Sequence, residues 1–219
     1  KRNKKSKKFI FPKKCLCGSK TIKETSQNTN KEDAVRRCIK GYECKFIAKE
    51  KLKHIVSKDA LNIDGLGKKV IEQFWELGLI KEPADIFNLN YQKISKLEGW
   101  GNLSINNLKK SIDKSKKIFL DKFIFSIGVR HIGQENAKIL AEFFGSIKEL
   151  EKLFDKEKIN TTLQNLKDLD GIGETQITSI RNFFLNKINL KITQNLIKEL
   201  NINDYSIKIT DGKFSNKKL

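Results

Sequence analysis

A short glycine turn that occurs four times constrains this sequence more than any other feature. Three copies read apolar–acidic–Gly–apolar–Gly, and the third copy in the chain is a longer Gly-to-Gly variant. Each copy precedes a stretch with apolar residues at three- and four-residue spacing, which predicts an amphipathic helix. Eight of the thirteen glycines fall in these turns, so the glycines are placed and not scattered. The four copies are 62–67, 96–101, 125–133 and 168–173.

The repeat predicts a mainly α fold built from tandem helix-hairpin-helix modules. We expect the first hairpin to pair with the second and the third with the fourth, which gives two stacked units. The central apolar residues Leu66, Trp100 and Ile172 are expected to fill the gap between the helices of each hairpin. The helical periodicity predicts helices at 68–77, 103–116, 120–127, 134–144, 147–154, 174–185 and 191–200.

A Gly-apolar-Gly turn that leads into a helix is suited to holding a phosphate group. Glycine permits a close approach of the backbone, and the first amides of a helix have no partner within it. Such contacts do not depend on the base, so four turns on one body would follow a DNA backbone. The candidate DNA-binding residues are Gly65, Gly67, Lys68, Lys69, Gly99, Gly101, Asn102, Gly128, Arg130, His131, Gly133, Gln134, Gly171, Gly173 and Thr175.

Two alternatives to this interpretation stay open. The glycines could only cap the helices of a bundle, or of a module that binds other proteins. Arg130 and His131, inside the long third turn, could contact DNA or form a surface pair without a role. The acidic residues Asp64, Glu98 and Asp170 each stand alone, which favours capping or orienting the turn over binding a metal.

The charge of the chain favours an anionic partner. Its 45 basic and 26 acidic residues give a net charge of +19, and residues 1–14 hold eight basic residues and no acid. Taking those eight away leaves +11, so the charge is not confined to one end. Nucleic acid, an anionic membrane or an acidic protein would all be attracted, although a generally lysine-rich composition is the plainer explanation.

Membrane and secretion signals are not apparent in the sequence. No apolar run approaches the ~18 residues that a membrane span needs, and the basic start leads only into the short apolar segment 9–12. The chain starts with lysine, and we expect a segment of a longer protein. We further expect a monomeric, cytoplasmic protein that is associated with the nucleoid and has no membrane partner.

All four cysteines lie in one short region and predict a metal site. They form two close pairs that flank a loop, an arrangement that can close a tetrahedral zinc site and replace an apolar core. Two disulfides or free thiols are the alternatives, but a bridge across one residue would be strained. His54 is a further candidate that we expect to be packed or exposed. The expected zinc ligands are Cys15, Cys17, Cys38 and Cys44.

These signals divide the chain into four expected parts. Residues 1–14 are a basic linker, and residues 15–50 form the cysteine module. Residues 51–205 form the helix-hairpin-helix domain, although the periodicity already weakens after residue 200. Residues 206–219 are a linker toward a C-terminal domain that this chain lacks.

In this order, the motifs resemble the carboxy-terminal half of bacterial NAD-dependent DNA ligases. The similarity begins at Phe11-Pro12, runs through the cysteines and includes all four hairpins over residues 9–205. It includes the segments 52–60 and 81–87 between them, and Gly128-Val129-Arg130-His131-Ile132-Gly133. The chain departs from the family at Cys15-Leu16-Cys17, which has one residue between cysteines where the family has two.

The resemblance implies a function that the chain would share with absent domains. The family takes AMP from NAD on a lysine of a Lys-x-Asp-Gly motif, and an oligonucleotide-binding barrel follows; this sequence contains no such motif. NAD and magnesium would therefore act only in the absent catalytic half, and we expect no catalytic residue and no activity here. The implied role is to grip nicked double-stranded DNA for sealing in replication and repair. A stand-alone, non-enzymatic repair accessory protein is the alternative.

Overall fold

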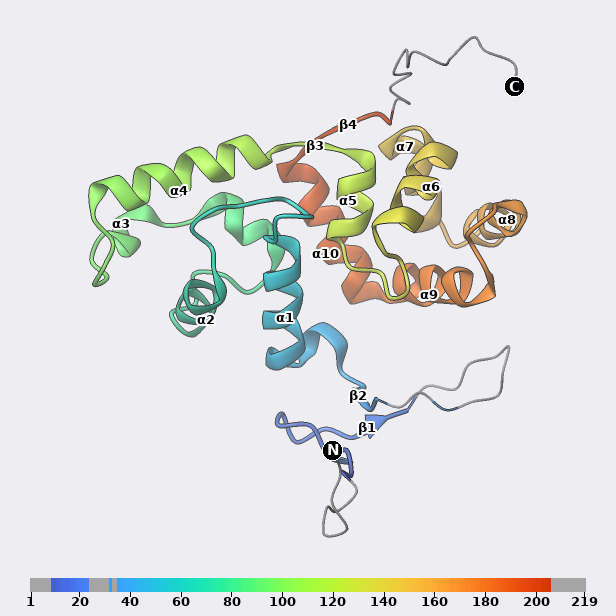
Figure 1. Cartoon of the computed structure of the whole chain (residues 1–219), viewed down its shortest axis with the longest axis horizontal. Helices are drawn as coiled ribbons and strands as arrows, with labels where there is room; N and C mark the ends of the chain where they lie inside the picture. Colours follow the sequence, from blue (N-terminus) through green and yellow to red (C-terminus); the bar gives the residue numbers. More distant parts are fainter. Residues whose placement is uncertain (1–8, 24–31, 33–34, 206–219) are drawn as a thin grey trace, which may run out of the picture.

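The computed structural model describes residues 9–23, 32 and 35–205, and is mainly helical (Figure 1). The prediction of a mainly α fold that starts with a small cysteine module is confirmed. The basic segment 1–8 and the expected linker 206–219 lie outside the described residues.

Ten α-helices and four short 3₁₀ helices make up most of the described part of the chain. The α-helices are α1 (Lys45–Ile55), α2 (Lys68–Glu76), α3 (Tyr91–Ile94), α4 (Asn102–Ser115), α5 (Leu120–Ser126), α6 (Gln134–Phe144), α7 (Ile147–Leu150), α8 (Ile159–Asn165), α9 (Glu174–Leu185) and α10 (Lys187–Glu199). The 3₁₀ helices are η1 (Gly41–Glu43), η2 (Pro83–Asn88), η3 (Glu151–Phe154) and η4 (Leu166–Asp168).

Two pairs of very short strands complete the described elements. Strand β1 (Thr21–Ile22) pairs antiparallel with β2 (Arg37–Cys38), and Thr21 faces Cys38. Strand β3 (Lys117–Phe119) pairs in parallel with β4 (Asn201–Asn203), which joins the middle of the chain to its last described residues. Residues 201–203, where the periodicity weakens, are therefore held to the helical body.

The predicted helices are present, with corrections at their ends. Helices α6 and α9 have the predicted bounds. Helix α10 begins at Lys187 instead of residue 191, because the side chain of Asn186 accepts the amides of Ile188 and Asn189 at 3.0 Å. The segment predicted as one helix at 147–154 divides into α7 and η3.

Three α-helices escaped prediction: α1, α8 and α3, which has only four residues. Helix α1 begins at Lys45, inside the segment expected to form only the cysteine module, and continues without a break across residues 50 and 51. Helix α8 lies between the third and fourth hairpins. Helices α1 and α8 each bury one face: Ala48, Leu52 and Ile55 in α1, and Ile159, Thr162 and Leu163 in α8.

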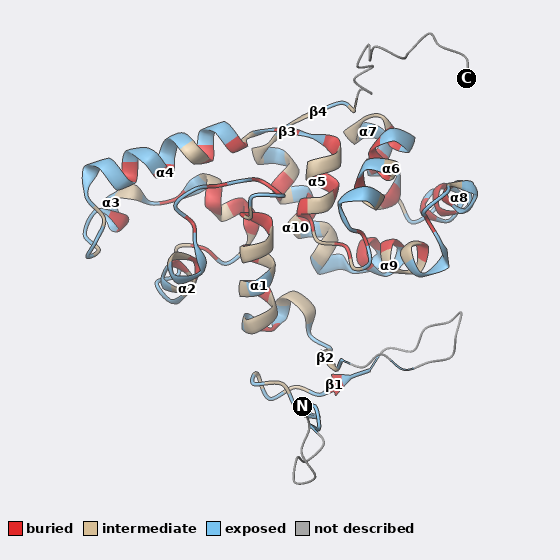
Figure 2. Cartoon of the chain, in the orientation of Figure 1, coloured by how far each residue is buried: buried red, intermediate tan, exposed pale blue. Residues whose placement is uncertain are grey.

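One apolar core extends through the helical body from α1 to α10. Its largest fully buried side chains include Phe74 of α2, Phe123 of α5 and Leu52 of α1. Figure 2 shows the buried positions on the inward faces of these helices, whereas the cysteine module is mostly half-buried or exposed. The core therefore holds the four hairpin turns on a common body.

The first and second hairpins form one unit. The amide of Asp64 in the first turn donates to Ser111 Oγ of α4, the helix that follows the second turn, at 2.7 Å. The ring of Phe74 packs against that of Trp100 with 5.3 Å between the centroids. The first two turns thus contact each other through the helix that follows each.

The third and fourth hairpins form the second unit. The Asn136 side chain of α6 donates to the carbonyl of Gly171 at 2.8 Å. The expected pairing of four hairpins in two units is confirmed.

Within the part of the chain that the structure covers, none of the helices combines the length and apolar character needed to cross a membrane.

Candidate nucleic-acid interface and metal site

The four glycine turns share one backbone geometry. The first glycine of each turn has a positive φ, between 66° and 93°, which side chains with a Cβ rarely adopt. The second glycine is extended and is the N-cap of the next helix: Gly67 of α2, Gly101 of α4, Gly133 of α6 and Gly173 of α9. The central residues Leu66 and Ile172 are buried, and Trp100 is half-buried. The sequence repeat is therefore also a structural repeat.

The protein's own fold does not require glycine at the second position. All four of these residues are exposed and have an extended backbone that any residue adopts. A Cβ atom would meet nothing within 4 Å at Gly67, Gly101 or Gly133, and only Gln176 Oε1, at 3.4 Å, at Gly173. Glycine is an acceptable N-cap, but Ser, Asp and Asn cap better. We call these four glycines bare N-caps, because they have no side chain of their own to cap the helix. Each therefore leaves room for a group from outside the protein.

The first position, in contrast, does require glycine. At Gly171 the φ is +87°, and a Cβ atom would lie 2.7 Å from Ile139 Cδ1 of α6. We expect Gly171→Ala to lower the free energy of unfolding by about 1–3 kcal/mol, since a side chain is strained at this φ. Urea denaturation measures the loss. Gly173→Ala is the matched control, with a loss below about 1 kcal/mol; equal losses would contradict the distinction between the two positions.

The charge beside the turns differs from one hairpin to the next. The first has exposed Lys68 and Lys69 and no acid in the first turn of α2. The second, with Asn102, also has no acid in the first turn of α4. In the third and fourth, Glu135 pairs with Lys138 at 2.8 Å and Glu174 with Lys167 at 3.2 Å. The first hairpin thus offers an anion the most favourable surroundings.

Side chains three residues after the second glycine bind two of the N-caps. The amide of Gly133 donates to Asn136 Oδ1 at 3.4 Å, and that of Gly173 donates to Gln176 Oε1 at 3.2 Å. Sequence reasoning missed these two residues. An amide side chain at the third helical position is a capping signal that would have found them.

The two basic residues of the third turn lie in different surroundings. Arg130 is half-buried, and burial lowers its pKa; it lines a cavity that also contacts η1 and α9. His131 is exposed and has a φ of +60°. The apolar neighbours Val129 and Ile132 fill the core beneath them.

The two remaining candidate residues, Gln134 and Thr175, lie at the starts of α6 and α9, and both are exposed.

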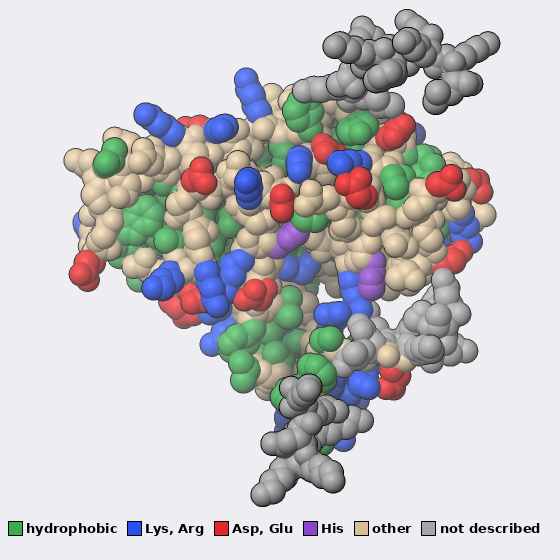
Figure 3. Space-filling model, in the orientation of Figure 1, with side chains coloured by type: hydrophobic (Ala, Val, Ile, Leu, Met, Phe, Trp, Pro, Cys, Tyr) green, Lys and Arg blue, Asp and Glu red, His purple; other side chains and the backbone are tan. Residues whose placement is uncertain are grey.

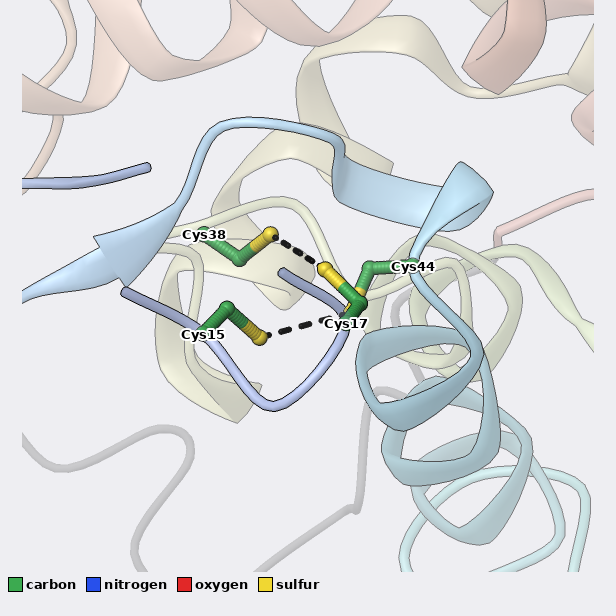
Figure 4. A group of neighbouring side chains, drawn as sticks. All are labelled: Cys15, Cys17, Cys38 and Cys44. Atoms are coloured by element: carbon green, nitrogen blue, oxygen red, sulfur yellow. Dashed lines mark hydrogen bonds between the residues drawn. The ribbon is translucent and has the colours of Figure 1, made fainter. Parts of the chain in front are cut away.

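The four cysteines converge on one point, although they come from three separate segments (Figure 4). All four Sγ atoms lie within 4.8 Å of one another. The Sγ–Sγ distances are 3.7 Å for Cys15–Cys44 and 3.6 Å for Cys17–Cys38, far longer than a disulfide bond. Sulfurs about 2.3 Å from a tetrahedral zinc ion would lie about 3.8 Å apart. The geometry therefore suits a tetrahedral metal ion.

The short spacing of the first pair does not keep its cysteines from the site. Gly18 follows the pair with a φ of +82°, and its amide donates to the Cys15 carbonyl at 2.9 Å. The Cys15 amide in turn donates to the Ser19 carbonyl at 2.8 Å. This tight turn brings Cys15 and Cys17 to the same point, opposite Cys38 on β2 and Cys44 at the start of α1.

The thiols differ in how readily they ionise. A hydrogen bond from the Ser19 side chain, assisted by the Ser19 backbone, lowers the pKa of Cys17 to about 6. Burial is the main reason that the pKa of Cys44 is raised. At Cys38 the hydrogen bond from the Lys40 backbone lowers the pKa, but burial and the neighbouring thiols outweigh it and raise the pKa to about 12. Four thiols this close need a cation to become thiolates together.

The cysteine module has almost no apolar core of its own. Among the described residues before Cys44, only Thr21 is buried. Its hydroxyl donates to the Pro12 carbonyl at 2.7 Å, and Arg36 Nη2 donates to the Thr21 carbonyl at 2.6 Å. A module held by so few contacts is typical of one that a metal stabilises.

His54 is packed away from the cysteines, as expected. Its Nε2 lies 2.9 Å from the Phe125 carbonyl, and its ring contacts that of Phe125 with 4.8 Å between the centroids. It thereby joins α1 to the start of the third hairpin. Among the described residues, the four cysteines form the only group of three or more potential ligands that come together, which excludes Asp64, Glu98 and Asp170 from such a group.

Comparison with known proteins gives two kinds of similarity. Residues 122–193, which contain the third and fourth turns, match the family model described as "Helix-hairpin-helix motif". The chain is 52% identical to a protein named DNA ligase from Pelagibacter ubique, over 99% of this chain and 32% of that protein. The resemblance to the carboxy-terminal portion of a DNA ligase is confirmed.

Other ligases give the same result. The DNA ligase of Azorhizobium caulinodans is 39% identical over 88% of this chain and 30% of its own length. That of Rickettsia bellii is 41% identical over 80% of this chain and 26% of its own length. The chain thus spans about a third of the length of these ligases. The match to the Pelagibacter ubique ligase, over 99% of this chain, includes both the cysteine module and the hairpins.

Proposed function

We propose that this chain is the DNA-binding portion of an NAD-dependent DNA ligase, which grips nicked duplex DNA by its phosphate backbone during replication and repair. The ligase relatives and the helix-hairpin-helix match support a DNA-binding role. NAD and magnesium would act in an adenylation domain outside this chain. An oligonucleotide-binding barrel would be its other partner.

The observation that carries the proposal is the set of four bare N-caps. Gly67, Gly101, Gly133 and Gly173 are exposed, and their backbone would accept a side chain. The amides that follow each of them lack partners within the helix and lie at its positive end. A phosphate oxygen reaches such amides only where no side chain intervenes. This explains a glycine that the fold itself does not need.

We further propose that the four cysteines hold a structural zinc ion. Thiolates in tetrahedral geometry are the ligand set that zinc prefers. Cys15, Cys17, Cys38 and Cys44 would supply all four bonds, and leave no open position for a substrate. The ion would fix the module at the N-terminal end of α1 and would take no part in chemistry.

Replacing a bare N-cap tests the DNA-binding proposal. We expect Gly67→Ala to weaken binding to a nicked duplex about tenfold, because the methyl group keeps phosphate from the amides. Fluorescence anisotropy with labelled DNA measures this. For six phosphate contacts, the wild type should give a log–log salt slope of about −5.

Ser146→Ala provides the control for this experiment. Ser146 is the N-cap of α7, which follows no glycine turn, and its side chain accepts the Glu149 amide at 3.3 Å. Its loss should reduce stability by about 1 kcal/mol and leave DNA affinity unchanged. Equal affinity of wild type and Gly67→Ala, or binding that is independent of salt, would refute the proposed grip.

A further inference from the structure

A cavity of about 320 Å³ lies between the cysteine module and the helical body. Its walls come from η1, α1, the third hairpin and the junction of α9 with α10. Gly128 and Arg130 of the third hairpin line it, whereas the four glycine N-caps lie outside it. We call it the Lys51 cavity, after the lysine of α1 that faces it. Figure 3 shows Lys and Arg side chains gathered in the region where the module meets the body.

The Lys51 cavity is lined by more positive than negative charge. Lys40, Lys51 and Arg130 face it, and Glu43, which is exposed, is the one acid in its lining. Asn182 adds an amide group that can donate. The residues come from segments more than 100 positions apart in the chain, so the fold gathers these charges.

Lys51 is held in a desolvated position over two aromatic rings. Its Nζ lies 4.6 Å from the centroid of the Tyr42 ring and 5.4 Å from that of Phe183. Within the described part of the chain, no carboxylate pairs with it. Burial lowers the pKa of Lys51 to about 8, and burial also lowers the pKa of Arg130. Partly desolvated cations that share a cavity repel each other and are stabilised by an anion that enters between them.

We propose that the Lys51 cavity binds a phosphate group, through the ammonium of Lys51 and the guanidinium of Arg130. The rings of Tyr42 and Phe183 fix the lysine, and Lys40 adds charge at η1. The cavity is larger than one phosphate, so it accepts the phosphate of a nucleotide or of a nucleic-acid strand. A nucleic-acid source rests on the proposed function, whereas the capacity to bind phosphate does not.

NMR of the full chain with labelled lysine side chains tests the phosphate site directly. The other charged or titratable groups that face the cavity are Lys40, Tyr42, Glu43 and Arg130. With inorganic phosphate as the probe, the pKa of Lys51 should rise by about one unit, equivalent to binding about tenfold tighter to the protonated amine. A Lys51 signal whose pKa does not change at saturating phosphate would overturn the proposal.

Lys51→Met and Lys49→Met form a matched pair of variants. Both remove a charge from α1 and retain an unbranched side chain, but Lys49 lies outside the cavity and pairs with Glu76 at 3.4 Å. Lys51→Met should weaken phosphate binding at least tenfold, and Lys49→Met should not. Equal phosphate binding by the two variants would overturn the proposal.

Titration of the same two variants with nicked duplex DNA identifies the source of the phosphate. Weaker DNA binding by Lys51→Met alone supports a DNA phosphate in the cavity. If only inorganic phosphate binding falls, the site stands and its nucleic-acid source is overturned. Because the phosphate arm uses no DNA, it also separates failure of this site from failure of the glycine grip.

Discussion

If the cysteines hold the proposed zinc ion, its removal is expected to unfold the described parts of the cysteine module, residues 9–23 and 35–43, and leave the helical body folded. The module buries almost no apolar surface, and four thiolates without a cation repel one another. The body keeps its core from Leu52 onward. Elemental analysis should give about one zinc ion per chain before chelation and none after it. In ¹H–¹⁵N spectra, the amide signals of the module should then collapse to random-coil positions, whereas those of α2 to α10 stay dispersed.

Re-addition of zinc is the control for this result. The signals of the module should return with one equivalent of zinc, and Cys44→Ser should prevent their return, since it removes one of the four ligands. A module that keeps dispersed signals after complete removal of metal would contradict a structural role for the ion.

Leu66→Ala is expected to cost about 2–5 kcal/mol of unfolding free energy. Leu66 is the central residue of the first turn and is only 2% exposed. Its side chain fills the space between the helices of the hairpin, and alanine would leave a cavity there. Urea denaturation followed by circular dichroism measures the loss.

Leu103 provides a matched control for Leu66. It follows the second turn, at the start of α4, and is 75% exposed. Leu103→Ala should change the unfolding free energy by less than about 0.5 kcal/mol. If the two variants lost the same stability, the central residue of the turn would not be the plug that joins the two helices.

Much of the fold follows from local sequence signals. Helices α6 and α9 were predicted with their bounds because the second glycine marks the start and the apolar spacing marks the length. Helix α1 was missed because its first residues follow directly on Cys44 and were assigned to the cysteine module. The spacing of Ala48, Leu52 and Ile55 carried its signal. The pairing of β3 with β4 had no local signal, since about 80 residues separate the strands.

The candidate site also has parts that local sequence signals predict and parts that they do not. The glycines and cysteines were found from sequence because each repeats at short spacing. The spacing did not show that the Cys15 thiol would lie beside that of Cys44, and the Cys17 thiol beside that of Cys38. The Lys51 cavity could not be predicted at all, since Lys51 and Arg130 come to line one cavity only when α1 packs beside the third hairpin.

The position of α1 has a mechanical consequence. Cys44, one of the four cysteines, is its N-cap, while Leu52 and Ile55 anchor its other end in the core and His54 contacts the third hairpin. A helix of eleven residues is a stiff rod about 16 Å long. We therefore expect any reorientation of the cysteine module to be transmitted along α1 to the third turn, because the described chain continues directly from Cys44 into this rigid helix.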